Sequence, residues 1–245
     1  MPAPSRTTAS ERRCLLLLPG LLCDAAVWAG QVARLEEKFE CRIPCYGELD
    51  SIEGMARAVL ADAPPRFTLI GHSMGGRVAL EITRSAPERV SALALLNTGY
   101  AARACGAEGE REVRERLALV ELAQRAGMRA MGRTWVQAMV HPARLEDQPL
   151  IEAILAMVER ATPQSFAAQI RALLARPDAT DVLGGIRCPT LLLCGREDQW
   201  SPLARHQRMA RLIPQAELAV IERCGHMAPM ERPQEVAARL ARWLA

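Results

Sequence analysis

The chain has 245 residues, half of them hydrophobic, and a formal net charge of only +3 at pH 7. This length can bury one substantial core. The small net charge, whose positive part is nearly all arginine, argues against a nucleic-acid partner. No stretch reaches the roughly 18 consecutive apolar residues of a membrane span.

The first apolar run, Cys14–Leu18, follows two arginines and superficially looks like part of a secretory signal. Pro19-Gly20 interrupts it at once, and no convincing cleavage site follows, so we interpret it as the first core strand. The eight cysteines form no Cys-x-x-Cys pair, and several lie within apolar strands. These features predict free thiols, no metal site and a cytoplasmic protein.

Strands and helices alternate in both outer parts of the chain. Before residue 100 the patterns predict strand 13–18, helix 25–37, strand 40–45, helix 51–62, strand 67–71, helix 74–86 and strand 89–96. After residue 165 they predict strand 190–194, helix 202–212, strand 216–221 and helix 233–244. This alternation is typical of an α/β protein with a mostly parallel sheet, here of about six strands, flanked by helices.

A serine lies between two glycines in the segment Gly71-His72-Ser73-Met74-Gly75, directly after an apolar run and before a helical pattern. Such a segment predicts a nucleophile elbow, a turn that lifts the Ser73 hydroxyl clear of the backbone. The first amides of the following helix, beginning with Met74, would face the charge that develops on an attacked carbonyl. A tight turn with an exposed serine is the alternative for the motif taken alone.

The interval 100–165 has helical periodicity and no strand-like alternation. We predict that it forms a helical lid inserted into a core of residues 1–99 and 166–245. A lid above the nucleophile would shape the substrate pocket. Our candidates for the pocket wall are Leu22, Trp135, Met139 and Met227. Packing of the lid residues onto the core is an equally good explanation for each of them.

Three arginines of this interval, Arg125, Arg129 and Arg133, recur every fourth residue and would share one face of a helix. Most such stripes are solvated surfaces. The alternative is a docking site for an acidic carrier protein or for a carboxylate of the substrate.

A base and an acid follow the serine in the order that a catalytic triad requires. Asp198 follows the apolar run 190–194 and a glycine turn, which places it at the carboxyl edge of a buried strand. Glu197 is its nearest competitor. His226 lies in a loop before the last helix, and we expect the other three histidines, His72 among them, to be packed or solvated residues. In particular, we expect His72 to point away from the serine.

These segments together resemble the α/β-hydrolase fold superfamily, and more closely its compact bacterial esterases and general hydrolases. The resemblance covers nearly the whole chain and rests on 18–22, 71–76, 186–190 and Gly225-His226 with 231–233. It implies a second oxyanion-hole amide after the first strand, at Leu21. Family members usually carry a His-Gly pair beside this amide, whereas this chain has Pro19-Gly20, and so lacks a side chain that could brace the loop.

The chemistry expected from these residues is hydrolysis of a carboxylic ester by Ser73, His226 and Asp198, without a cofactor, on a small acyl substrate. Lactones, thioesters and carbon–carbon bonds are alternative targets of the same fold. The carbon–carbon bond hydrolases place a tryptophan after the catalytic histidine, where this chain has Met227. A ligand receptor built on a hydrolase shell is the alternative from another class. The sequence leaves the oligomeric state open.

Overall fold

A single six-stranded sheet organises the computed structural model, which describes residues 12–245. The strands are β1 (Cys14–Leu18), β2 (Glu40–Arg42), β3 (Phe67–His72), β4 (Val90–Leu96), β5 (Thr190–Gly195) and β6 (Glu217–Ile221). Their order is β2-β1-β3-β4-β5-β6, and every neighbouring pair is parallel. The predicted fold class is confirmed. Residues 1–11 of the predicted core lie outside the described residues.

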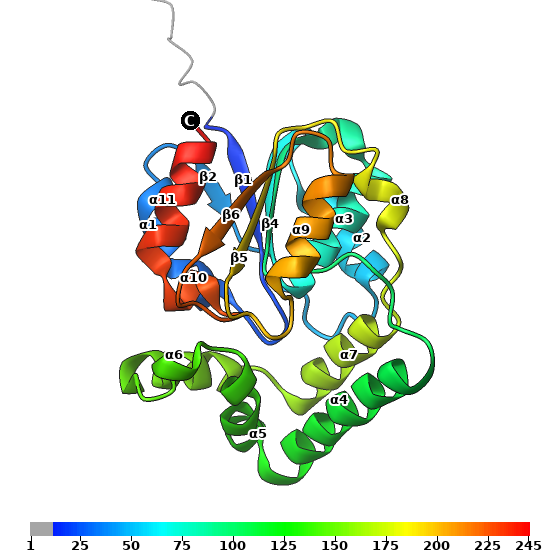
Figure 1. Ribbon diagram of the computed structural model, residues 1–245, viewed down its shortest axis with the longest axis vertical. Coiled ribbons are helices and arrows are strands. Elements are labelled where there is room, and N and C mark those ends of the chain that lie inside the picture. Colours follow the sequence, from blue (N-terminus) through cyan, green and yellow to red (C-terminus); the bar gives the residue numbers. More distant parts are fainter. Residues whose placement is uncertain (1–11) are drawn as a thin grey trace, which may run out of the picture.

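The strands read as continuous apolar runs because helices cover both faces of the sheet. In Figure 1, α1 (Ala29–Leu35) and α11 (Pro233–Trp243) lie on one face. On the other lie α2 (Ile52–Asp62), α3 (Met74–Ser85), α8 (Thr180–Leu183) and α9 (Leu203–Leu212). All five residues of β1 and all six of β5 are buried. The central strands therefore lie in the hydrophobic core.

Two predicted elements differ from the structure for local reasons. The strand predicted over 40–45 ends at Arg42, because Pro44 has no N–H to donate to the ladder of this edge strand. The helix predicted over 25–37 starts as a 3₁₀ turn, Ala25–Trp28, in which the Asp24 carboxylate accepts a hydrogen bond from the Ala26 N–H at 2.8 Å. The α-helical part α1 follows it.

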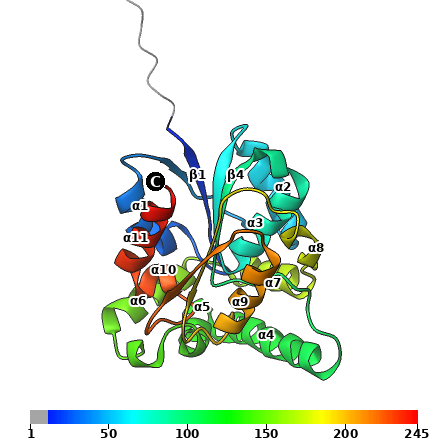
Figure 2. The ribbon, with the colours of Figure 1, turned by 45° about the horizontal axis from the view of Figure 1, so that its top comes forward.

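A helical insertion between β4 and β5 lies across the carboxyl ends of the strands (Figures 1 and 2). It contains α4 (Gly106–Ala126), α5 (Met128–Trp135), α6 (Gln148–Glu159) and α7 (Pro163–Leu174). The predicted lid boundary at residue 165 falls inside α7, which a capping box at Thr162 and Ser165 starts. Because α7 lies beside α4, we propose that the lid ends after Leu174.

The arginine stripe of the lid is divided in the structure. Arg125 belongs to α4, which ends at Ala126, whereas Arg129 and Arg133 belong to α5. The Arg129 guanidinium lies 2.6 Å from the Glu152 carboxylate and 3.0 Å from that of Glu159, both on α6. Arg129 thus braces two lid helices against each other, which weakens the docking alternative for this stripe.

Buried and exposed contacts both tie the lid to the core. Arg160 of the lid forms an ion pair with Asp24 at 2.6 Å. The backbone N–H of His141 donates to the buried Glu231 carboxylate at 2.8 Å.

Among residues 12–245 no helix combines the length and apolar character needed to cross a membrane.

Candidate active site

The turn after β3 carries Ser73 in a strained conformation. Its φ of 53° and ψ of −114° lie outside the regions that L-residues ordinarily adopt, a strain that concentrates at functional sites. Gly75 approaches the β1 backbone so closely that a Cβ there would collide with the carbonyl oxygen of Leu18. The Thr98 hydroxyl donates to the Ser73 carbonyl oxygen at 2.6 Å and so ties the turn to the residues after β4. The sharp turn predicted from the glycines is present.

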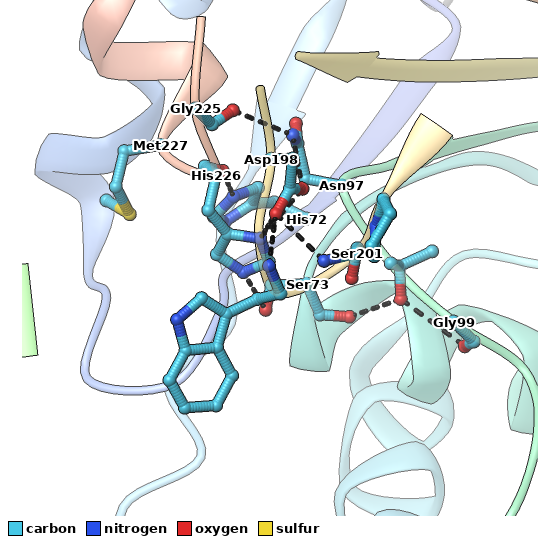
Figure 3. Close-up of polar contacts among 12 residues, drawn as sticks. His72, Ser73, Asn97, Gly99, Asp198, Ser201, Gly225, His226 and Met227 are labelled. Carbon is cyan, nitrogen blue, oxygen red and sulfur yellow. Dashed lines mark hydrogen bonds and ion pairs between the residues drawn. The ribbon is translucent and has the colours of Figure 1, made fainter. Parts of the chain in front are cut away.

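Ser73, His226 and Asp198 meet in one chain of hydrogen bonds (Figure 3). The Ser73 Oγ lies 2.7 Å from His226 Nε2. The His226 Nδ1 lies 2.9 and 3.0 Å from the two carboxylate oxygens of Asp198. An ionised carboxylate can only accept, so Nδ1 carries the proton and Nε2 is free to accept the proton of the serine. This is the geometry that activates a serine hydroxyl.

Asp198 is held ionised by a full set of donors. Burial by itself would raise the pKa of this carboxyl, but His226, the Ser201 N–H and the Asn97 amide outweigh burial and lower the pKa well below its ordinary value. The backbone N–H groups of Trp200 and Ser201 donate to Oδ1 at 2.9 and 2.8 Å. This carboxylate therefore stays charged while it orients the imidazole.

Asn97 is a site residue that the sequence did not reveal. Its Nδ2 donates to Asp198 Oδ2 at 2.9 Å and to the Gly225 carbonyl oxygen at 3.2 Å (Figure 3). It directly follows β4. Its φ of 48° is a second sign of a constrained site. Asn97 links the loops that carry the acid and the base.

The loop that carries His226 is fixed from two sides. The N–H groups of His226 and Met227 both donate to the Met139 carbonyl oxygen of the lid, at 2.8 and 3.0 Å. The buried Glu231 carboxylate accepts from the Gly225 and Met227 N–H groups at 3.0 and 3.1 Å. The lid thus positions the catalytic base directly, as well as covering it.

The His72 side chain is packed against His226. Its Nε2 lies 2.9 Å from the His226 carbonyl oxygen, to which it must donate, and the two rings are 5.4 Å apart. His72 also contributes to the wall of the cavity around Ser73. It is therefore packed, as expected, but beneath the catalytic histidine, where it supports the backbone of His226.

The two residues predicted to supply the oxyanion-hole amides, Leu21 and Met74, lie in the wall of the same cavity as Ser73. Met74 N–H begins α3, and Leu21 N–H belongs to the turn after β1. The neighbouring Leu22 N–H donates to the Gln169 side chain of α7 at 3.0 Å. Gln169 therefore braces this loop from the lid, a support that the Pro19-Gly20 sequence did not suggest.

A cavity of about 390 Å³ opens onto Ser73 and His226 between the core and the lid. Three of the four residues predicted for its wall, Trp135, Met139 and Met227, lie in it. Leu22 does not line it, and this corrects our prediction. The residue is 3% exposed and has a positive φ of 61°, and the neighbours on either side line the cavity instead, namely Leu21 and Cys23.

Two buried histidines should make the fold sensitive to acid. Burial is the main cause that lowers the pKa of His72 to about 3 and that of His206 to about 4, from an ordinary value of 6.5. As the pH falls below 6.5 the unfolded chain binds protons that the folded chain does not. The free energy of unfolding should then fall by up to about 1.4 kcal/mol per pH unit for each histidine.

Urea denaturation between pH 7.5 and pH 4.5 measures this slope. His206 Nε2 accepts from the Thr98 N–H at 3.2 Å, so His206→Gln should lower stability at pH 7.5 and flatten the profile below pH 6.5. Parallel profiles for the two proteins would contradict this explanation.

An activated serine, a base and a buried carboxylate at the carboxyl edge of a parallel sheet define a serine hydrolase. The model of the Alpha/beta hydrolase family matches residues 15–239, and the chain belongs to that family.

Known proteins agree with this assignment. The chain is 27% identical over 240 residues to a pimeloyl-[acyl-carrier protein] methyl ester esterase of Nitrosomonas europaea, covering 90% of this chain and 91% of the relative. It superposes on a thermophilic esterase of Thermogutta terrifontis, solved with malate bound, with a TM-score of 0.83 and 27% identity, covering 96% and 90% of the two chains. An enol-lactonase of Burkholderia xenovorans shares the fold, with a TM-score of 0.82, 21% identity and coverage of 96% and 92%.

Proposed function

We propose that this protein hydrolyses carboxylic esters through an acyl-enzyme formed on Ser73. The hydrogen-bonded chain from Ser73 through His226 to Asp198 is the observation that carries the proposal. Esterase relatives that align over nine-tenths of the chain support it. The eight free thiols are those expected in a reducing compartment, so we also infer a cytoplasmic location.

In the first half of the reaction, Ser73 Oγ attacks the carbonyl carbon of the ester while its proton passes to His226 Nε2. The carbonyl electron pair moves onto oxygen, and the N–H groups of Leu21 and Met74 bind the resulting oxyanion. Each such donor is worth about 3–4 kcal/mol of barrier lowering. The oxyanion then collapses, and the leaving alkoxide takes the proton from His226 and departs as the alcohol.

In the second half, a water molecule takes the place of the alcohol. His226 Nε2 accepts one of its protons as the water oxygen attacks the acyl carbon, and the same amides bind the second oxyanion. Collapse breaks the bond from carbon to Ser73 Oγ, which recovers its proton from His226. The acid product leaves, and Asp198 stabilises the imidazolium in both halves.

Hydrolysis of p-nitrophenyl esters from acetyl to long acyl chains tests this proposal. The protein should release p-nitrophenol, with an optimum acyl length set by the cavity, and His226→Ala of verified fold should not. The same assay with a lactone and a thioester compares the other acyl targets. No turnover of any of these by the folded protein would favour the receptor alternative and overturn the proposal.

The acyl pocket should depend on Trp135, which is buried in the lid at 5% exposure and lies in the cavity wall. Trp135→Ala opens this wall, so kcat/KM for long acyl chains should rise relative to acetyl by about tenfold. The matched control is Trp243→Ala on α11, away from the cavity. An equal loss of rate at every chain length would rule out a role of Trp135 in the pocket.

A further inference from the structure

The cavity beside Ser73 contains more positive charge than catalysis by the triad requires. Four arginines line it: Arg77, Arg116, Arg176 and Arg205. Glu112 lies among them, and the Glu115 carboxylate at the wall is 66% exposed and nearest to Arg111. Positive groups therefore outnumber negative ones in the interior of the cavity.

Two of these arginines share one carboxylate. The Glu112 carboxylate accepts hydrogen bonds from Arg116 Nε at 2.9 Å and from Arg176 at 2.7 and 2.8 Å. Burial by itself would raise the pKa of Glu112, but the hydrogen bonds and charges of the two arginines outweigh burial and lower the pKa to about 2, so Glu112 is ionised. Each of these two guanidinium groups therefore has a carboxylate partner, which the other two arginines of the cavity lack within residues 12–245.

Arg77 and Arg205 have no carboxylate within ion-pairing distance in the part of the chain that the structure describes. Arg77 Nη1 donates to the Ala101 carbonyl oxygen at 2.9 Å, and Arg205 Nη1 donates to that of Trp200 at 2.9 Å. Backbone carbonyls satisfy some of their N–H groups without cancelling the charge. Burial, and then the other arginines, lower the pKa of Arg77.

The two unpaired guanidinium groups converge on Gly99. A Cβ at Gly99 would lie 3.0 Å from Arg77 Nη2 and 3.2 Å from Arg205 Nη1. The glycine therefore lets both arginine side chains pack closely against it, side by side at the wall of the cavity. Two neighbouring guanidinium forks at a cavity wall suit the two oxygens of a carboxylate.

This pair of arginines lies close to the nucleophile. Arg77 is on the first turn of α3, the helix that begins directly after Ser73. Gly99 follows Thr98, whose hydroxyl is bonded to the Ser73 backbone, and Figure 3 shows Gly99 on the opposite side of Ser73 from Met227. The cavity that contains Ser73 is also lined by Arg77, Thr98, Gly99, Arg205 and Met227.

We propose that Arg77 and Arg205 form a subsite for a carboxylate of the substrate, so that the enzyme prefers esters that carry a carboxylate, such as half-esters of dicarboxylic acids. This substrate class rests on the proposed esterase function. Bound there, the carboxylate would be held by charged hydrogen bonds while the ester carbonyl lies at Ser73. Glu112 with Arg116 and Arg176 is the same pairing built from the protein's own side chain.

Monomethyl adipate and dimethyl adipate differ by one ester methyl group and one negative charge. Titration of the acid released at pH 7.5 should give a kcat/KM for the monoester about 10- to 100-fold above that for the diester, the range expected of charged hydrogen bonds. In Arg77→Met the ratio should fall towards one. The matched control, Arg208→Met, removes an exposed charge from α9 outside the cavity and should keep the ratio.

Arg205→Met provides the second variant. Arg205 also bonds to the loop that holds Asp198, so its replacement can lower the rate for both esters, and the ratio of the two kcat/KM values is therefore the quantity to compare. A wild-type ratio near or below one would overturn the subsite. A ratio that survives both Arg77→Met and Arg205→Met would do so as well. A ratio lost equally in Arg208→Met would mean that overall charge, rather than this subsite, attracts the substrate.

A binding measurement separates the subsite from the reaction. In Ser73→Ala, which cannot turn over, glutarate should raise the melting temperature more than inorganic phosphate or glutaramide at the same concentration, and Arg77→Met should abolish the difference. If no ester is hydrolysed but glutarate still binds in this way, the proposed function fails and the carboxylate site stands. If esters are hydrolysed but glutarate raises the melting temperature no more than phosphate or glutaramide does, the carboxylate subsite is wrong and the proposed function stands.

Discussion

Replacing Ser73 with alanine is expected to lower kcat for ester hydrolysis by about 10⁴- to 10⁶-fold, because the variant lacks the nucleophile that attacks the ester and carries the acyl group. The elbow backbone should persist, since the close approach at Gly75 does not involve the serine side chain. Steady-state hydrolysis of a p-nitrophenyl ester measures the effect, with circular dichroism to verify the fold.

The matched control is Ser91→Ala, because Ser91 belongs to β4 and does not line the cavity. It should leave kcat within about twofold, as expected of a substitution away from the site. The double variant Ser73→Ala with His226→Ala should be no worse than either single variant, because the two groups act as a unit. If the losses of kcat in the two single variants multiply in the double variant, the two groups do not act as a unit.

Asp198→Asn is the second large effect. The amide has one acceptor oxygen where the carboxylate has two, so it cannot serve both the Trp200 and Ser201 N–H groups on one side and the imidazole Nδ1–H on the other. It also supplies no negative charge opposite the imidazolium. The wrong tautomer of His226 should then dominate, and kcat should fall by about 10⁴-fold. Ester hydrolysis at pH 7.5 gives the loss in kcat.

Glu197→Gln is the natural comparison, since Glu197 competes with Asp198 in the sequence. Its carboxylate accepts from the Cys224 N–H at 3.0 Å and so supports the loop of the base without contacting the imidazole. We expect Glu197→Gln to lower stability more than kcat. A loss of kcat as large as that of Asp198→Asn would contradict the assignment of Asp198 as the acid of the triad.

The strands and the order of the triad could be predicted because their signals are local. Each central strand is a short apolar run followed by a turn, and the candidate residues follow β3, β5 and β6 directly or within a short loop. Strand order then explains why they meet: β3, β4, β5 and β6 are successive neighbours in the sheet. Parallel strands bring all of their carboxyl ends to one edge.

The supporting residues could not be predicted in this way. Asn97, Gln169 and Glu231 are ordinary polar residues, and nothing near them in the sequence marks their partners. Gln169 meets its partner Leu22 across 147 positions of the chain, and Asn97 meets Asp198 across 101. Their roles follow from the tertiary fold, in which the lid contacts the loops of the site.

The end that we propose for the lid differs from the predicted one for a related reason. The pattern of α7 is helical in either assignment, and its packing beside α4 is what favours including it in the lid. The arginines of the cavity also come from segments far apart, α3, α4, the residues after α7, and α9. Their convergence on Gly99 appears only in three dimensions.

Reaction with a fluorophosphonate, followed by peptide mapping by mass spectrometry, tests the central claim most directly, because only an activated serine attacks this phosphorus centre. The account predicts stoichiometric labelling on the peptide that contains Ser73, and no labelling in His226→Ala of verified fold. An unlabelled wild-type protein, or a label on another residue, would contradict the assignment of Ser73 as the nucleophile.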